Sequence, residues 1–371
     1  GADLVKESLE YVSLISEKLS ERYDAPVIIA NCPNIPETIF GNLDQSIAGT
    51  LRNSINEYNS GLQSFIKDED FILDLDLLAS TIGLEDWNDP IIYNLAKMPI
   101  STQWIPHLSE NICRVLASIL GKTRRVLVLD LDNTLWGGVI GDDGLDGIKL
   151  GNGDATGEAF LEFQRTILKL HERGILLAVS SKNEDINARL PFREHPDMLI
   201  DETHISVFKA NWDDKPSNIR LIAEELSLGL SSLVFFDDNP MERDIVRKMT
   251  PSVAVPEVPN DPSLYTRVLL AAGYFESSNF SDEDKIRNQT YKENKARFEL
   301  KETITDIDEY LFSLNMKSSM TPFDEIGMKR IAQLVSKSNQ FNLTTIRYSE
   351  TELNRIMNDE SYITLQIRLS D

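Results

Sequence analysis

The sequence predicts an α/β fold with a parallel sheet, and three observations support this prediction. Short apolar runs recur along the chain, at 126–129, 175–179 and 232–236. Apart from Ser232 at the start of the third run, each run is apolar, as expected of a strand that is buried on both faces of a parallel sheet. Each run ends in polar or acidic residues, and segments with helical spacing separate the runs. The chain is therefore expected to alternate strand and helix around one sheet.

Length and composition limit the class of protein. With 371 residues, the chain is long enough for two or three domains, and 41% hydrophobic with 26% charged residues is a globular composition. A formal net charge of −23 argues against nucleic acid and against anionic membrane surfaces as partners. Cys32 and Cys113 provide no zinc framework and no disulfide pattern, and they fit a reducing cytoplasm. No signal peptide and no membrane-spanning apolar run is visible, so we expect a cytoplasmic protein.

Residues 1–120 predict a separate α/β domain ahead of this sheet. Its expected helices lie at 3–22, 46–67 and 107–120, and its expected strands at 26–30 and 71–75. Asn31-Cys32-Pro33-Asn34 follows the first of these strands, where α/β proteins often place a site. A single polar loop is weak evidence for a site, so we interpret this loop as structural.

The residues that carry chemistry start where the strand at 126–129 ends, with Asp130-Leu-Asp132-Asn-Thr134. Two carboxylates crowded at the end of a buried strand are unfavourable unless a cation or a phosphoryl group uses them. An Asp-x-Asp-x-Thr sequence after such a strand resembles the first motif of the haloacid dehalogenase (HAD) superfamily, whose members use an aspartate nucleophile for phosphoryl transfer.

This resemblance implies a role for each motif residue. Asp130 is expected to attack phosphorus, to carry the phosphoryl group as an aspartyl phosphate and to ligate the metal. Asp132 is expected to protonate the leaving oxygen, to activate water and to ligate the metal through its backbone carbonyl. Thr134 is expected to hold the loop or the phosphate by hydrogen bonds. The metal in the superfamily is normally Mg²⁺, which neutralises phosphate charge.

Glycines are frequent in the segment after Thr134, at positions 137, 138, 141, 144 and 147. They predict a tight β-hairpin flap that closes over the site. Trp136 either lines the mouth of the site or packs beneath the hairpin, and the sequence favours neither. A helix is then expected at 156–173.

A second polar group, Ser180-Ser181-Lys182-Asn183, follows the strand at 175–179. The second superfamily motif is a Ser or Thr at a strand end that binds phosphate, and alignment of the strand ends favours Ser181. Lys182 and Asn183 then fall in the substrate-binding mouth. Alone, this group is an ordinary helix-capping turn, and its position one strand and helix after the first motif gives it significance.

Lys215 matches the third superfamily motif. It follows a strand expected at 206–210 and precedes a helix expected at 217–226. A Lys near the start of a helix is unfavourable for the helix dipole, which favours a functional role over a surface charge. The resemblance implies that Lys215 stabilises negative charge around the nucleophile and the phosphate.

The strand at 232–236 ends in Asp237-Asp238, which match the fourth, metal-binding motif. One carboxylate is enough to cap the helix that follows, and a second would be repelled by the first. Alignment favours Asp238 as the direct Mg²⁺ ligand and Asp237 as a residue behind it. A further strand is expected at 252–256.

Longer stretches narrow the resemblance to the FkbH-like family of the HAD superfamily. They are 130–144, 181–183, Asn211-Trp212 with Lys215, and 236–243. The likeness implies a Mg²⁺-dependent domain with a Rossmann-like HAD core and a small flap instead of a large cap. It also implies that the domain takes a phosphorylated glyceryl unit from 1,3-bisphosphoglycerate and loads it on the thiol of an acyl carrier protein. Relatives carry Cys where this chain has Ser180, so acyl transfer through that Cys is not expected here.

The same resemblance assigns the rest of the chain. The expected order is an SGNH-hydrolase-like domain at 1–120, the HAD-like domain at 121–274, a helical connector at 275–315 and the beginning of a GNAT-like acyltransferase domain at 316–371. The connector contains a charged helix expected at 281–302, and the GNAT likeness rests on 336–343 with Tyr348-Ser349. The chain begins without Met and stops after a strand-like run at 362–367, so both flanking domains look partial.

The expected activity is Mg²⁺-dependent phosphoryl transfer on a phosphorylated small molecule, with an acyl carrier protein as the acceptor. The alternative within enzymes is a general small-molecule or protein phosphatase, because a site without a large cap is open to macromolecules. The alternative from another class is a scaffold module that keeps the HAD fold without turnover. Intact Asp130, Asp132, Lys215 and Asp238 argue against a scaffold.

Overall fold

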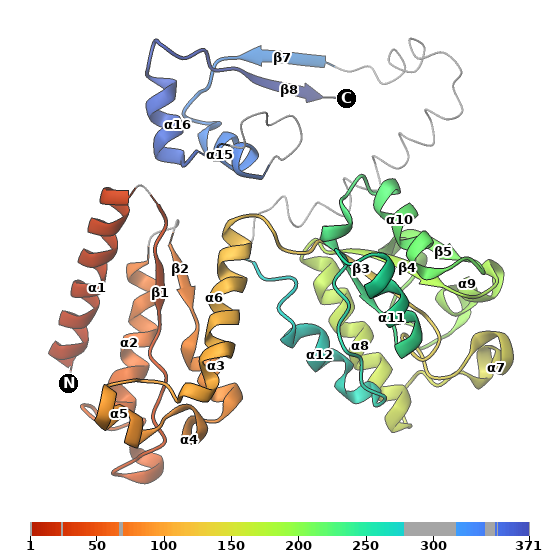
Figure 1. Cartoon of the computed structure of the whole chain (residues 1–371), viewed down its shortest axis with the longest axis horizontal. Coiled ribbons are helices and arrows are strands. Elements are labelled where there is room, and N and C mark those ends of the chain that lie inside the picture. The colour runs from red at the N-terminus through yellow and green to blue at the C-terminus, as the bar shows by residue number, and fades with distance from the viewer. Residues whose placement is uncertain are drawn as a thin grey trace. The chain divides into compact units, whose positions relative to one another are not determined.

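The computed structural model describes residues 2–23, 25–66, 70–277, 317–337, 346 and 348–370. The chain divides into two units, one of residues 1–121 with 317–370 and the other of residues 122–316 (Figure 1). The helix expected at 281–302 and most of the segment 336–343 lie outside the described residues.

The second unit contains a four-stranded parallel sheet in the order β5-β4-β3-β6. Its strands are β3 (Val126–Leu129), β4 (Leu176–Ser181), β5 (Ile205–Ala210) and β6 (Leu233–Phe236). Its helices are α7 (Ile140–Gly147), α8 (Ala155–Glu172), α9 (Asp185–Glu194), α10 (Lys215–Glu225), α11 (Pro240–Met249) and α12 (Tyr265–Ala271). Alternating strands and helices around a parallel sheet confirm the predicted α/β class.

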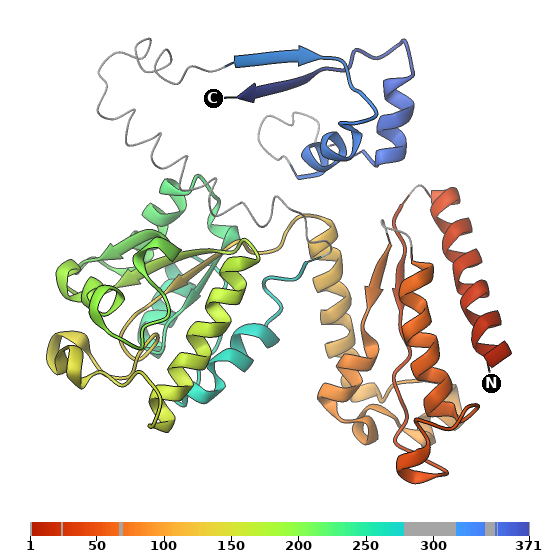
Figure 2. The same ribbon diagram turned by 180° about the vertical axis from the view of Figure 1, so that it is seen from behind.

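Helices cover both faces of this sheet, which explains the continuous apolar runs in the sequence. Leu127 and Leu129 belong to one buried core together with Phe163 of α8. Val128, from the same strand, belongs to a second core together with Ile222 of α10. Figure 1 shows α10 and α11 in front of the sheet, and Figure 2 brings α8 to the front. In such a sheet, the loops at the carboxyl edge are the natural place for a site.

Residues 2–121 contain a second, two-stranded parallel sheet of β1 (Ile28–Ala30) and β2 (Phe71–Leu73). The helices are α1 (Ala2–Tyr23), α2 (Leu51–Phe65), α3 (Leu75–Ile82), α4 (Leu84–Trp87), α5 (Pro90–Ala96) and α6 (Ile105–Ile119). Ala79, Trp87 and Ile100 form a small buried core. The sequence predicted this α/β alternation but missed α3, α4 and α5. The SGNH-like assignment stays a prediction.

Residues 317–370 contain an antiparallel pair, β7 (Lys317–Thr321) and β8 (Gln366–Ser370). Between them lie α15 (Met328–Lys337) and α16 (Glu350–Met357). Met328, Ile331 and Leu353 form the buried core of this segment. The GNAT-like assignment stays a prediction.

The predicted β-hairpin flap is wrong in its local structure. Gly137 and Lys149 form a single antiparallel bridge, and the chain between them contains helix α7. The carboxylate of Asp143, in the first turn of α7, accepts a hydrogen bond from the Val139 amide at 2.7 Å. This bond satisfies a free donor at the helix start, where negative charge is also favourable. Acidic first-turn residues therefore favoured a helix where the glycines had suggested a turn.

Two predicted strands are also placed incorrectly. The strand expected at 252–256 is reduced to one parallel bridge between Ala254 and Val234, because Pro251 and Pro256 on either side cannot donate to a ladder. The strand expected at 362–367 lies later in the chain, because pairing with β7 starts only at Gln366.

Candidate active site

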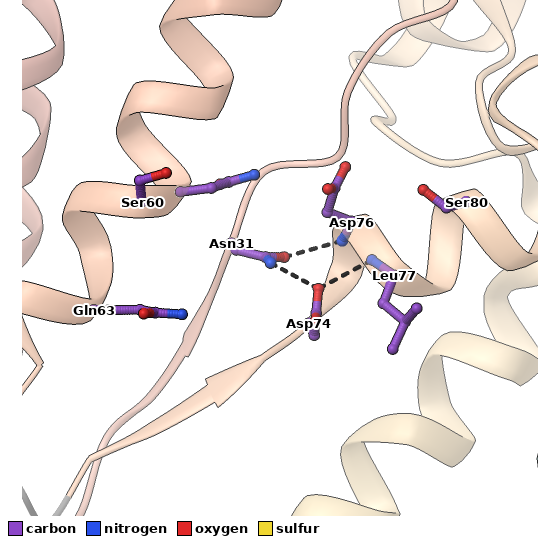
Figure 3. Close-up of a pocket in the computed structure, with 8 residues that line it drawn as sticks. Asn31, Ser60, Gln63, Asp74, Asp76, Leu77 and Ser80 are labelled. Carbon is purple, nitrogen blue, oxygen red and sulfur yellow. Dashed lines mark hydrogen bonds between the residues drawn. The ribbon is translucent and has the colours of Figure 1, made fainter. Parts of the chain in front are cut away.

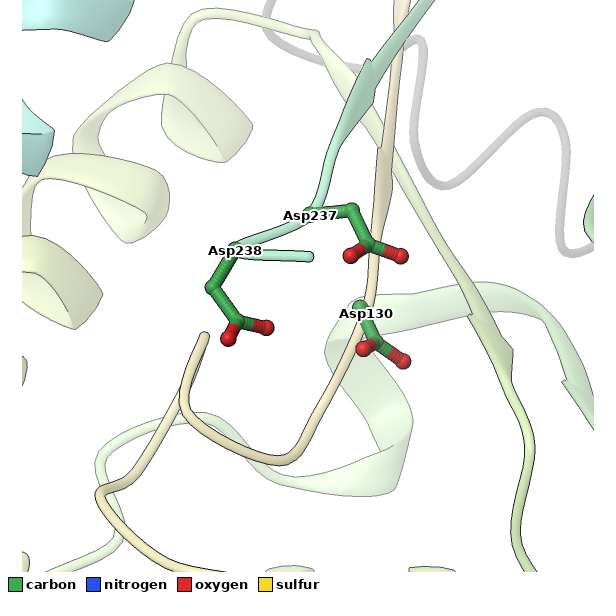
Figure 4. Close-up of side chains that lie close together, drawn as sticks. All are labelled: Asp130, Asp237 and Asp238. Carbon is green, nitrogen blue, oxygen red and sulfur yellow. The ribbon is translucent and has the colours of Figure 1, made fainter. Parts of the chain in front are cut away.

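Three carboxylates meet at the carboxyl edge of the four-stranded sheet. Asp130 follows β3, and Asp237 and Asp238 follow the neighbouring strand β6. Leu129 and Phe236 are paired in register, so both loops leave the sheet at the same level. One carboxylate oxygen from each Asp lies within 4.8 Å of the others, and Figure 4 shows the three side chains side by side. Such a cluster of oxygen ligands suits a divalent cation.

Lys215 places one positive charge against this cluster. It is the first residue of α10 and is 1% exposed. Its Nζ atom lies 2.6 Å from Asp130 Oδ1 and 3.2 Å from Asp237 Oδ2. It also donates a hydrogen bond to the carbonyl oxygen of Ser180 at 2.6 Å. The ammonium group therefore contacts two of the three carboxylates in a buried position.

Burial and mutual repulsion raise the pKa values of two of these carboxyl groups. Burial, followed by repulsion from Asp130, raises the pKa of Asp237 to about 7 and that of Asp238 to about 6. Burial alone would lower the pKa of Lys215, but the attraction of Asp130 and Asp237 outweighs it and raises that pKa. Lys215 therefore stays protonated, and the cluster has negative charge to share with a further cation.

Asp132 lies outside the carboxylate cluster and has its own set of hydrogen bonds. Its Oδ1 atom accepts from the indole of Trp136 at 3.0 Å and from the Ile140 amide at 2.9 Å. Its Oδ2 atom accepts from the side-chain amide of Asn183 at 2.7 Å. Trp136 is fully buried and its ring packs edge-on against Phe192, so it does not line the mouth of the site. The carboxylate is thus held by residues 136–140 and by the loop after β4.

Thr134 connects the two loops that hold the cluster. It is fully buried, and its Oγ1 atom accepts a hydrogen bond from the Asp238 amide at 3.3 Å. Ser180 is also fully buried, and its hydroxyl makes no hydrogen bond with the described residues. A nucleophilic side chain at position 180 would therefore have no exposed surface in this structure.

The other predicted site residues in the loop after β4 have separate hydrogen-bond and ion-pair partners. Ser181 is 1% exposed, and its hydroxyl accepts a hydrogen bond from Asn183 at 3.2 Å. Lys182 pairs with Glu242, from the first turn of α11, at 2.5 Å. Lys182 is thus paired with a carboxylate outside the cluster.

The sequence analysis missed two residues that support these loops. Arg243 of α11 is 5% exposed, and its guanidinium donates to the carbonyl oxygens of Asp237 at 2.8 Å and Asp238 at 2.7 Å. Tyr265 donates its hydroxyl hydrogen to the carbonyl oxygen of Asn133 at 3.0 Å. An Arg in the first turns of a helix, where the dipole disfavours it, was the available signal for Arg243.

Comparison with known proteins places this geometry in a family. The family model described as FkbH, N-terminal domain, matches residues 2–117. The chain is also similar to a crystal structure of the N-terminal part of the protein BF1531 from Bacteroides fragilis, which contains a phosphatase domain and is complexed with Mg. The two share 37% sequence identity with a TM-score of 0.69, over 76% of this chain and 75% of the other. This chain belongs to the FkbH-like family.

Other comparisons add little to this assignment. An uncharacterized protein from Corynebacterium glutamicum matches 42% of the FkbH-like chain and 97% of its own length. At 12% identity and a TM-score of 0.28, that likeness supports no argument. No protein with a curated description matches the FkbH-like chain. None of its helices in the described ranges has the length and apolar character needed to cross a membrane.

We expect the metal-free FkbH-like chain to lose stability between pH 5 and pH 8. The pKa values of Asp237 and Asp238, about 7 and about 6 in the folded chain, lie above the unfolded value of about 3.9. A carboxyl group with a raised folded pKa stabilises the fold below the unfolded pKa, and this stability is lost as pH rises through the folded pKa. Thermal melting in chelator across this range measures the effect. A flat profile, or one matched by Asp237→Asn, would contradict the raised pKa values.

Replacing Arg243 with Met should destabilise the fold by about 2–4 kcal/mol, because two buried carbonyl oxygens lose a charged donor. Equilibrium urea unfolding measures this. Lys248→Met, on the same helix, is the control, because exposed Lys248 pairs with Asp244 alone among the described residues, and its loss should change stability by less than about 0.5 kcal/mol. Equal effects in the two variants would show that Arg243 does not support the loop.

Proposed function

We propose that this chain is a Mg²⁺-dependent phosphatase or phosphotransferase that works through an aspartyl phosphate on Asp130. The observation that carries the proposal is the contact of Asp130 with Lys215, 2.6 Å apart, inside a three-carboxylate cluster at the sheet edge. A relative with 37% identity is described as a phosphatase domain complexed with Mg, which supports the same reaction class.

Each residue then has a defined task. Asp130 uses one carboxylate oxygen to attack phosphorus, and the bond from phosphorus to the leaving oxygen breaks. Lys215 holds Asp130 in place and offsets the negative charge that gathers around it. Asp132 gives a proton to the leaving oxygen and later takes one from the water that hydrolyses the aspartyl phosphate. Its hydrogen bonds to Trp136 and Asn183 keep its carboxylate in one orientation between these steps.

The residues of the cluster fit Mg²⁺. The cation prefers carboxylate oxygens, and Asp130, Asp237 and Asp238 supply three within 4.8 Å. Burial and then repulsion from Asp130 raise the pKa values of Asp237 and Asp238, and a bound cation would relieve this repulsion. Bound Mg²⁺ would neutralise the phosphate and orient it for in-line attack.

The family assignment extends the proposal to the substrate. We propose a phosphorylated glyceryl unit as the donor and an acyl carrier protein as the acceptor, as the FkbH-like resemblance implies. Release of phosphate from three-carbon phosphates, with and without a carrier protein, distinguishes this substrate from those of a general phosphatase.

A Mg²⁺ titration of phosphate release tests the proposed function. Activity should vanish with chelator and return with Mg²⁺. Asp238→Asn should weaken Mg²⁺ binding by more than about 100-fold, and Asp237→Asn by about 10-fold, because Asp237 is fully buried and already bonded to Lys215 and Asn239.

Asp244→Asn serves as the matched control, since Asp244 lies on α11 and, within the part of the chain that the structure describes, its ion pair is with Lys248 alone. Its Mg²⁺ dependence should equal that of the original chain. Full activity in chelator would overturn the proposal, and a stronger effect of Asp237→Asn than of Asp238→Asn would reverse the ligand assignment.

A further inference from the structure

We propose that the N-terminal unit binds a small polar molecule carrying an ammonium group, a function beyond the proposed phosphoryl chemistry. The site is a pocket of about 500 Å³ lined by residues between positions 31 and 80 (Figure 3). This volume lies in the range of small-molecule sites. The pocket lies where β1 and β2 end, which is the edge where parallel sheets place their ligands.

A fixed set of hydrogen bonds forms the floor of the pocket. Asn31, directly after β1, donates its side-chain amide hydrogen to Asp74 Oδ1 at 2.7 Å. Its Oδ1 atom accepts from the Asp76 amide at 3.0 Å. Asp74 Oδ1 also accepts from the Leu77 amide at 3.0 Å, which caps α3 (Figure 3). The floor is therefore formed before any ligand arrives, which favours binding.

Several polar groups in the pocket remain available for a ligand. Asp74 uses Oδ1 for its bonds, and Asp76 uses Oδ1 to accept from the Asn34 amide at 2.8 Å. The second oxygen of each carboxylate makes no hydrogen bond with the described residues. Three further lining side chains, Ser60, Gln63 and Ser80, also make no side-chain hydrogen bond with the described residues. Two of these come from α2 and one from α3, so they face the floor from both sides (Figure 3).

The charge of the pocket selects the kind of ligand. Its lining contains two carboxylates and no Lys, Arg or His, so a phosphorylated molecule would be repelled. A protonated amine would instead form charge-assisted hydrogen bonds with the free carboxylate oxygens. Hydroxyl groups on the ligand would complement the Ser and Gln side chains. Leu77, which is 64% exposed, offers an apolar contact for the carbon skeleton.

The neighbouring thiol argues for binding without covalent chemistry. Burial, followed by the charge of Asp76, raises the pKa of the Cys32 thiol. A thiol in this state is a poor nucleophile. The loop that begins at Asn31 was interpreted as structural from the sequence, but its first residue also lines the pocket.

Three hexoses that differ in charge test the proposal on the full chain. Glucosamine is cationic, glucose is neutral and glucose 6-phosphate is anionic. In a ¹H–¹⁵N NMR titration, we expect glucosamine to bind about two- to fivefold tighter than glucose, and glucose 6-phosphate not to bind. Asp74→Asn and Asp76→Asn should each reduce the preference for glucosamine over glucose, and the double substitution should abolish it, because Asn keeps the Oδ1 acceptor and removes only the charge.

Glu85→Gln is the matched control, because it removes one negative charge from an exposed position on α4 outside the pocket. It should leave both affinities unchanged. Equal binding of glucosamine and glucose, equal weakening by Glu85→Gln, or no binding of any probe would overturn the proposal. Phosphate release is measured in each variant as a separate assay. A negative binding result would therefore overturn this proposal without contradicting the proposed phosphatase activity.

Discussion

Replacing Asp130 with Asn should reduce phosphate release by at least about 10⁴-fold while the chain stays folded. The amide has nearly the same shape as the carboxylate but cannot attack phosphorus. The fold should survive, because Lys215 keeps its contacts with Asp237 and the Ser180 carbonyl oxygen. One of three mutually repelling carboxylates is also removed. Initial rates of phosphate release and a thermal melt measure the two parts of this expectation.

Asp213→Asn provides the control for this substitution. Asp213 is exposed on the loop before α10, and its carboxylate makes no hydrogen bond with the described residues. Its loss changes the net charge as Asp130→Asn does, so activity should be unchanged. Activity above about one hundredth of the original in a correctly folded Asp130→Asn variant would remove Asp130 as the nucleophile.

The sequence predicted the members of the carboxylate cluster through the resemblance to the HAD motifs, and the common edge at which parallel strands end explains why they meet. Asp130, Lys215, Asp237 and Asp238 each follow a strand or begin the helix after one, so the topology alone brings them together. No knowledge of side-chain contacts was needed for that step. The core strands were predictable for a different reason, since burial on both faces of the sheet leaves a continuous apolar run in the sequence.

The local choices of hydrogen-bond partner were not predictable in this way. Trp136 lies four residues after Asp132. Its indole donates to that carboxylate because the turn between them brings the two side chains together. Arg243 gains its two carbonyl partners because α11 starts directly behind the Asp237 loop. The flap formed a helix because Asp143 could satisfy an amide at its start. Each outcome depends on the approach of neighbouring backbone, which residue spacing does not encode.

Replacing Lys215 with Met should cause the second large effect, on both activity and stability. Met fills a similar volume next to Phe235 but carries no charge. Buried Asp237 and partly buried Asp130 then remain without their cation, and breaking such a pair costs about 3–5 kcal/mol. Loss of this preorganised charge should also slow phosphate release by about 10²–10³-fold. Urea unfolding and initial rates measure the two effects.

The stability loss in Lys215→Met should depend on pH with a defined sign. The pKa values of Asp237 and Asp238 are already raised to about 7 and about 6 with Lys215 present, and they rise further without it. Below pH 5 Asp237 is protonated and needs no cation, so the loss is smaller there. As pH rises above 7, Asp237 ionises in the original chain, where Lys215 balances it, but has no cation in the variant, so the loss grows. Lys209→Met, which removes a paired Lys from β5, should cost less than about 1 kcal/mol at either pH. A loss in Lys215→Met that is equal at pH 5 and pH 8 would show that Lys215 does not balance the charge of Asp237.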